Sequence, residues 1–301
     1  MSYKLHENLV NPARQKSGIF RLLLGLVTLT LIYLVLLTAL LFALKLALGG
    51  VWVGNLRPGV VTTPGQTLTL LGSFSTMAIA VGTVVLILHH RSPATLLGGL
   101  RPAFDQFRQS IRGLFPYLII LILLVFSSQD MQPHLAIGTW LTLLPITLVL
   151  LMVQVGAEEL VFRGYLQSQL AALNAPTFVW ILLPSVAFGL LHYDPATTGD
   201  LAPWIVLWAI LFGVAAADLT ARYGTLGPAI AMHFVNNFAA ITLMGVKDNL
   251  GGLNLYVYPF SISNSSKLME ILPLETFALG LAYLSIRWAM ASRVAISSAD
   301  D

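Results

Sequence analysis

The sequence predicts an all-α protein: a polytopic membrane bundle of about eight transmembrane helices with both termini inside the cell. Three observations lead to this prediction: 57% of the 301 residues are hydrophobic, only 10% are charged, and long apolar runs recur along the chain. Soluble domains carry about 25% charged residues, so the composition excludes a water-soluble enzyme, a disordered protein and a nucleic-acid binder. The net charge of +3 is too small to indicate an acidic partner, and the absence of cysteine excludes disulfides and thiolate metal sites.

Apolar runs of about 18 residues or more can span a bilayer as helices, which satisfy their own backbone hydrogen bonds in lipid. The first run is too long for a signal-peptide core, so we expect it to remain in the protein. The third is short and contains Pro116, which suits a tilted or partly re-entrant segment. Pro176 marks the start of the fifth, because proline suits a first helical turn. The predicted segments are 19–48, 66–88, 113–128, 138–157 with a helical continuation to about 173, 177–193, 203–222, 226–245 and 268–290.

No internal repeat, low-complexity stretch or soluble domain interrupts this pattern. We therefore expect one bundle over 19–290, with cytoplasmic tails at 1–18 and 291–301. Lys and Arg concentrate in the cytoplasmic loops of membrane proteins, and an eight-helix topology with the N-terminus inside places twelve of them there against three outside. The twelve are Lys4, Arg14, Lys16, Arg21, Arg91, Arg101, Arg108, Arg112, Arg163, Arg222, Arg287 and Arg293; the three are Arg57, Lys247 and Lys267.

The connection between the second and third segments, residues 89–113, allows two interpretations. Phe104, Phe107 and Ile111 recur near helical spacing beside arginines, as in an amphipathic helix lying on the inner leaflet. A solvated basic loop fits the same residues.

A small group of polar residues interrupts the apolar segments. Because ionisable groups are costly inside a membrane, each is a candidate functional residue. Asp218 and Arg222, four residues apart, are interpreted as a structural ion pair, and Asn236 as a packing amide. A single such residue usually bridges two helices, but a set spread over three helices favours a site. The group comprises Glu158, Glu159, Arg163, His192, Asp218, Arg222, His233, Asn236 and Asn237.

Helical spacing predicts which of these side chains lie together. Glu159 and Arg163 are four residues apart and can pair on one face, while Glu158 points about 100° away from Glu159. His233 and Asn237 are also four apart and project side by side.

The chain positions of the candidates predict their depth. Glu158 lies 17 residues before Ala175 and His192 lies 17 after it, so antiparallel helices joined there place both roughly 25 Å from the turn. His233 and Asn237 lie only roughly 10–20 Å beyond the turn before their helix. All four meet if the fourth and fifth helices project from the bilayer on the cytoplasmic side, in a site within the inner leaflet that opens inward.

Three sequence boxes carry a family resemblance. Residues 158–163 form an EExxxR box, residues 188–192 an FxxxH box and residues 233–237 an HxxxN box. In order and spacing the chain resembles the CPBP family of intramembrane proteases, also called the Abi or CAAX-protease family and related to the type II CAAX prenyl endopeptidases. The resemblance covers a protease core at about 140–245, and the rest matches only as hydrophobic helices.

The residue types themselves suggest activation of water. A carboxylate and an imidazole in a poorly solvated pocket can take a proton from a water molecule, and the water oxygen then attacks a carbonyl. A second histidine with an amide neighbour can donate hydrogen bonds to the resulting oxyanion. The resemblance implies that Glu158 and His192 activate the water and that His233 and Asn237 form the oxyanion site.

The resemblance also implies supporting roles for Glu159 and Arg163, with Arg163 orienting the glutamates and favouring their charged forms. A metal variant uses the same atoms, because Glu158, His192 and His233 would form the His₂Glu ligand set of catalytic zinc. The chain lacks the HExxH helix that presets two zinc ligands. We favour metal-free catalysis that requires no cofactor, and zinc stays open as the alternative.

The predicted function is a multi-pass endopeptidase of the cell membrane that cleaves membrane-associated or lipidated peptides near the inner leaflet. An alternative is a non-catalytic immunity or scaffold protein of the same fold, since Abi-type members are associated with bacteriocin self-immunity. A proton-coupled transporter is disfavoured because no inverted repeat is found. The expected partners are the lipid bilayer and a peptide or lipidated protein, without nucleic acid, and the sequence predicts neither prenylation of the substrate nor an oligomeric state.

Overall fold

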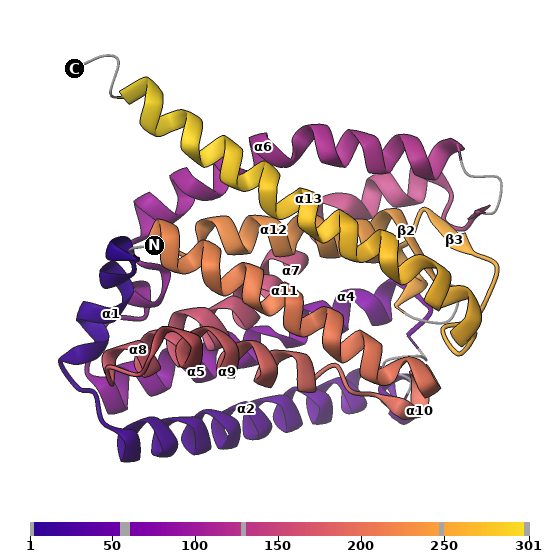
Figure 1. The fold of residues 1–301 in the computed structure, drawn as a ribbon. Helices are drawn as coiled ribbons and strands as arrows, with labels where there is room; N and C mark the ends of the chain where they lie inside the picture. Colours follow the sequence, from indigo (N-terminus) through magenta and orange to yellow (C-terminus); the bar gives the residue numbers. More distant parts are fainter. Residues whose placement is uncertain (1–2, 55–60, 128–130, 247–249, 298–301) are drawn as a thin grey trace.

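The computed structural model describes residues 3–54, 61–127, 131–246 and 250–297. Long helices run alongside one another (Figure 1), and the predicted all-α class is confirmed. Helix α1 and the C-terminal end of α13 lie at the same end of the bundle. Arg57 and Lys247, two of the three basic residues predicted outside, lie beyond the described residues, as do residue 128 of the predicted third span and the last residues of the C-terminal tail.

The helices are α1 (Glu7–Arg14), α2 (Ile19–Leu48), α3 (Gly50–Gly54), α4 (Pro64–Ser73), α5 (Ser75–His89), α6 (Leu100–Ser127), α7 (Ile137–Glu159), α8 (Ser168–Ala172), α9 (Thr177–Leu190), α10 (Pro195–Thr198), α11 (Ala202–Tyr223), α12 (Gly227–Phe238) and α13 (Ser265–Ser297). Two π-helical segments, η3 (Leu160–Gln167) and η5 (Ala239–Leu243), continue α7 and α12. Short 3₁₀ turns are η1 (Lys4–His6), η2 (Pro93–Leu97), η4 (Gly199–Leu201) and η6 (Gly251–Leu253).

Three short strands form a small sheet at the end of the bundle opposite α1 (Figure 1). They are β1 (Gln132–Pro133), β2 (Met244–Val246) and β3 (Tyr256–Tyr258), with β3 in the centre. Strand β3 is antiparallel to β1, with Gln132 opposite Val257, and parallel to β2, with Met244 opposite Tyr256.

Five helical stretches in the described part of the chain are long and apolar enough to cross a membrane. Helices α6, α9 and α12 run alongside them (Figure 1) without meeting that measure of length and composition. The count of eight spanning helices and the orientation therefore remain predictions. The five stretches are Ile19–Leu48, Pro64–His89, Ile137–Ala172, Pro195–Tyr223 and Ser265–Ala291.

Helix α6 joins two segments that were predicted as separate elements. The basic connection and the predicted third span form one helix from Leu100 to Ser127, so the alternative of a solvated loop is wrong for this stretch. Phe107 and Ile111 pack against the core while Phe104 stays exposed. The N-terminal, amphipathic half of α6 therefore packs its apolar face against the protein core.

The N-terminal segment packs on the bundle. Leu9, Val10 and Ala13 of α1 are buried, and the Tyr3 hydroxyl donates a hydrogen bond of 2.7 Å to Asp218 in α11. The ion pair predicted between Asp218 and Arg222 is confirmed, with 2.5 Å between the Arg222 Nε and the carboxylate. These contacts connect the start of the chain to α11.

Helices α9 and α11 approach closely because glycines line their contact. A Cβ at Gly189 would lie 2.4 Å from the Ile210 side chain, and one at Gly213 would lie 2.9 Å from the Ser185 Cα. Small residues allow this close backbone approach between membrane helices. The contact holds the end of α9, with Phe188, against the centre of the bundle.

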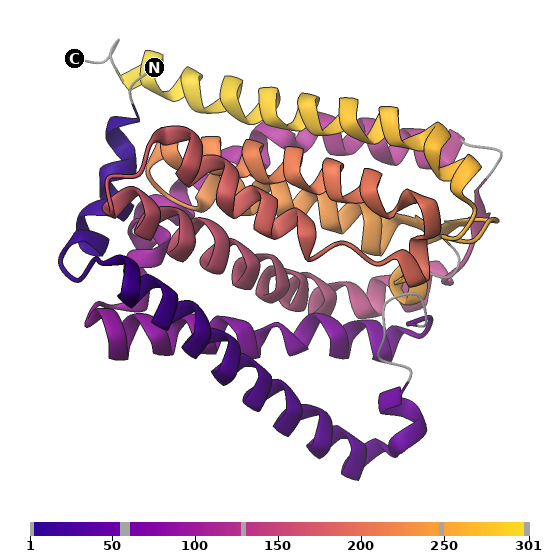
Figure 2. The ribbon, with the colours of Figure 1, turned by 60° about the horizontal axis from the view of Figure 1, so that its bottom comes forward.

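Helix α12 is enclosed by its neighbours. It packs against α6, α7, α11 and α13, and Ala229, Ala231 and Met232 are almost entirely buried. Helix α2, in contrast, buries only residues of its first half and diverges from the bundle toward its C-terminal end (Figure 2). The side chains of α12, and His233 among them, therefore lie in the core.

Candidate active site

Two adjacent glutamates lie where α7 changes into the π-helical segment η3. Glu158 and Glu159 are the last residues of α7, and Arg163 lies within η3. Such π segments interrupt α-helices mostly in short pieces and occur frequently at functional sites. The boundary between the two helix types thus coincides with the EExxxR box.

Glu159 is buried and accepts hydrogen bonds from two side chains. Its Oε1 accepts a hydrogen bond of 3.0 Å from Arg163 Nη1 and one of 2.8 Å from His233 Nδ1. The Glu159 and Arg163 side chains have no exposed surface, and the pairing predicted from their spacing is confirmed. Because a carboxylate only accepts hydrogen bonds, His233 carries a proton on Nδ1 and directs Nε2 elsewhere.

Glu158 meets that second nitrogen of His233. The distance between His233 Nε2 and Glu158 Oε2 is 3.4 Å, and the same Oε2 accepts a hydrogen bond of 2.9 Å from Gln154 Nε2. The Glu158 side chain keeps 13% of its surface exposed, whereas Glu159 keeps none. One imidazole therefore links the fully buried glutamate to the more accessible one.

Asn237 joins the same group through Gln154. Its Nδ2 donates to Gln154 Oε1 at 2.9 Å, and its own Oδ1 accepts from Asn236 at 3.0 Å. Asn237 was predicted beside His233, whereas Gln154 was not among the predicted site residues. The available signal was a polar residue in an apolar run, four residues before Glu158 and on its helix face.

Phe188 lies at the centre of the aromatic contacts around the site. Its ring centroid is 4.7 Å from the Arg163 guanidinium carbon, in cation–π range. The His192 ring lies 4.7 Å away and the His233 ring 5.9 Å away on the same measure. Phe188 thus accounts physically for the aromatic position of the FxxxH box.

His192 lies outside the helix in which it was predicted. Helix α9 ends at Leu190 rather than near residue 193, and His192 is an exposed residue of the following turn. After this turn, Asp194 caps α10 by accepting a hydrogen bond from the Thr197 N–H. His192 Nδ1 donates to the Phe188 carbonyl oxygen at 2.9 Å, which leaves Nε2 as the accepting nitrogen.

The structure thus brings five predicted site residues, with Gln154 added, into one set that is linked by hydrogen bonds and by the Glu158–His233 contact. That set contains Glu158, Glu159, Arg163, His233 and Asn237. His192 reaches it through the Phe188 ring. The arrangement offers a partly accessible carboxylate, an imidazole nitrogen and an oriented amide at one point in an apolar bundle.

The zinc alternative requires three donor side chains that converge on one point. Within the described ranges, no three His, Cys, Asp or Glu side chains converge as a metal site requires. Glu158 and His233 are neighbours, but His192 does not complete a ligand set with them. The residues in this arrangement do not fit a resident zinc ion.

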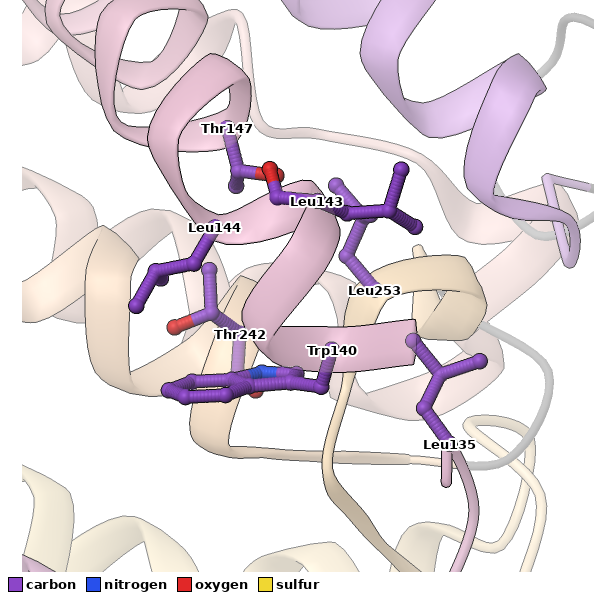
Figure 3. Close-up of a pocket in the computed structure, with 7 residues that line it drawn as sticks. All are labelled: Leu135, Trp140, Leu143, Leu144, Thr147, Thr242 and Leu253. Atoms are coloured by element: carbon purple, nitrogen blue, oxygen red, sulfur yellow. The ribbon is translucent and has the colours of Figure 1, made fainter. Parts of the chain in front are cut away.

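A small hollow lies apart from the site. Figure 3 shows Trp140 and its neighbours around it, between the first turns of α7 and the segment that follows α12. The Trp140 Nε1 donates to the Thr242 carbonyl oxygen at 2.8 Å. The lining is mainly apolar and contains none of the predicted site residues, so we assign the hollow to packing. It is formed by Leu135, Trp140, Leu143, Leu144, Thr147, Thr242 and Leu253.

Fold and site together define the class of protein, a multi-pass helical membrane protein with a glutamate–histidine site inside its bundle. Residues 139–239 match the family model described as type II CAAX prenyl endopeptidase Rce1-like. All three boxes lie within the matched residues, and the resemblance predicted from them is confirmed. The matched family is, by its description, one of endopeptidases.

The chain is also similar to an uncharacterized protein, YyaK, of Bacillus subtilis (strain 168), at 27% identity over 126 residues. The similar region covers 42% of this chain and 42% of that protein. The chain therefore matches less than half of this relative's length.

Proposed function

We propose that the chain is an intramembrane endopeptidase that hydrolyses a peptide bond with water activated by Glu158. The observation that carries the proposal is the Glu158–His233 contact of 3.4 Å, tied to Asn237 through Gln154. A carboxylate, an imidazole and an amide donor at one point are the groups that hydrolysis of an amide needs. The Rce1-like match over residues 139–239 supports the same activity.

In the proposed reaction Glu158 takes a proton from water while the water oxygen bonds to the peptide carbonyl carbon. The carbonyl oxygen becomes an oxyanion, which accepts hydrogen bonds from Asn237 and from His233 when Nε2 is protonated. The C–N bond then breaks, and Glu158 returns its proton to the leaving amine. The products are a carboxylic acid end and a free amine.

His192 is proposed to act from the substrate side. Its ring is exposed, and its Nδ1 bond to the Phe188 carbonyl leaves Nε2 available as a proton acceptor. This nitrogen can share the water proton with Glu158 once a substrate closes the site. Catalytic hydrogen bonds are often long before substrate binds, so the separation in the free protein is compatible with that role.

We infer that the substrate is a lipidated or membrane-associated peptide. The chain is proposed to cleave it near the inner leaflet of the cell membrane. The wording of the matched family, a CAAX prenyl endopeptidase, supports a peptide with a prenyl group. The twelve-to-three distribution of Lys and Arg supports a cytoplasmic position for the helix ends near both termini. No cofactor is required in this proposal.

Quantitative proteomics of membranes tests the function. Cells expressing Glu158→Gln are expected to accumulate an uncleaved precursor that the wild type removes. Glu270→Gln is the matched control, because it makes the same change at an exposed glutamate paired only with Lys267 in the described structure. Equal precursor levels in Glu158→Gln and wild-type membranes would refute the proposal.

A further inference from the structure

Gln154 connects the two ends of the proposed catalytic group. It is 6% exposed in the core and lies one helical turn before Glu158. Its Nε2 donates to Glu158 Oε2 at 2.9 Å, and its Oε1 accepts from Asn237 Nδ2 at 2.9 Å. A single side-chain amide thus contacts both the proposed base and the proposed oxyanion donor.

The direction of each hydrogen bond in this chain follows from the carboxylate. An ionised carboxylate only accepts, so Gln154 must present its NH₂ to Glu158 and its oxygen to the other side. That oxygen requires a donor, so Asn237 presents Nδ2. The Oδ1 of Asn237 then faces Asn236, whose Nδ2 donates to it at 3.0 Å.

The result is a row of three amides whose donors all point toward Glu158. Chains of hydrogen bonds with one direction polarise each other in a low-dielectric interior. One N–H of the Asn237 amide donates to Gln154. The second N–H of the same NH₂ group is thereby held in a fixed position. Gln154 therefore orients the carboxylate and the amide relative to each other.

We propose that Gln154 is a positioning residue of the protease site, which holds the Glu158 carboxylate and the Asn237 amide in their working orientations. This inference rests on the proposed function. Gln154 acts through its two neighbours and needs no contact with substrate. Loss of its amide is expected to lower the rate of the chemical step more than it weakens substrate binding.

The variants are Gln154→Leu, which removes both hydrogen bonds, and Gln154→Glu, which keeps an acceptor for Asn237 but removes the donor to Glu158. The matched control is Gln167→Leu in η3. Gln167 is fully buried and donates to the Ala217 carbonyl oxygen at 3.1 Å, outside the site. Its replacement removes a buried glutamine of equal size without touching Glu158 or Asn237.

Cleavage is measured with purified protein in phosphatidylcholine–phosphatidylglycerol vesicles. The probes are a farnesylated peptide with a C-terminal CAAX sequence and the precursor that accumulates in Glu158→Gln membranes. Gln154→Leu and Gln154→Glu are expected to lower kcat by about 10–100-fold with KM within about threefold of wild type. Gln167→Leu is expected to retain kcat, and thermal unfolding of each variant reports any loss of folding.

A double-mutant cycle with Asn237→Ala separates positioning from simple destabilisation. If Gln154 acts partly through Asn237, the fold-loss from Gln154→Leu is smaller in the Asn237→Ala background than in the wild type. Equal losses in both backgrounds, or a kcat for Gln154→Leu equal to that of Gln167→Leu, would overturn the inference while leaving Glu158 catalysis intact. Undiminished cleavage by Glu158→Gln would instead refute the proposed function.

Discussion

His233 donates its Nδ1–H to the fully buried carboxylate of Glu159 across 2.8 Å. The bond fixes the tautomer and the rotation of the ring, so Nε2 faces Glu158. Glu159 is itself paired with Arg163. A buried ion pair thus orients the imidazole that lies beside the accessible glutamate.

The two site histidines are expected to differ in what their replacement costs. His233→Ala removes a hydrogen bond to Glu159 and a ring packed 4.9 Å from Phe212, so it should lower both turnover, by about 100-fold or more, and thermal stability. His192→Ala removes an exposed ring and should lower turnover with little change in stability. Parallel cleavage and thermal-unfolding measurements check this.

The exposed His134 provides a control, since His134→Ala is expected to change neither quantity. Full activity of His192→Ala would remove that residue from the proposed water activation. Unchanged stability of His233→Ala would contradict the importance of its bond to Glu159.

The Glu159–Arg163 pair predicts a characteristic stability pattern. Arg163→Met leaves the Glu159 charge buried without its cation, and breaking a buried pair this way costs about 3–5 kcal/mol. Adding Glu159→Gln removes the stranded charge, so the double variant should be more stable than Arg163→Met alone. Thermal unfolding in one detergent compares the wild type, Arg163→Met, Glu159→Gln and the double variant. A double variant no more stable than the single one would argue against the buried pair.

Much of the helical architecture follows from the apolar runs, because lipid requires each segment to satisfy its own backbone. The pairing of Glu159 with Arg163 follows from helical spacing, which is local. The contact of His233 with both glutamates joins residues more than 70 positions apart and depends on how α12 packs against α7. Local spacing carries no information on that packing.

The same distinction explains two differences from the predictions. Helix α9 ends at Leu190 and α10 begins after its Asp194 cap, and the apolar run, which continues through Leu191, does not mark where α9 ends. Gln154 was not among the predicted site residues. Only its two partners in space connect it to the site.

Metal dependence gives a third prediction. Because no described set of side chains fits zinc, cleavage should persist after exhaustive treatment with a chelator followed by gel filtration. Metal content is measured on the same sample by elemental analysis, and a zinc protease treated identically is the positive control. Loss of cleavage that zinc alone restores would establish the His₂Glu alternative.

The N-terminal segment gives the last prediction, on pH. Burial lowers the pKa of His6, which lies outside the membrane-spanning segments, from 6.5 to about 4, and its ring packs 4.7 Å from Trp180. Between these two values the unfolded segment binds more protons than the docked one, so stability rises with pH through this window and is constant above it. Acidification from pH 7 to pH 4.5 should therefore lower the Tm of the wild type. His6→Phe removes the titrating group, and its Tm should fall less over the same range, whereas His134→Phe should follow the wild type. Equal pH dependence in all three proteins would show that His6 does not couple protonation to docking of this segment.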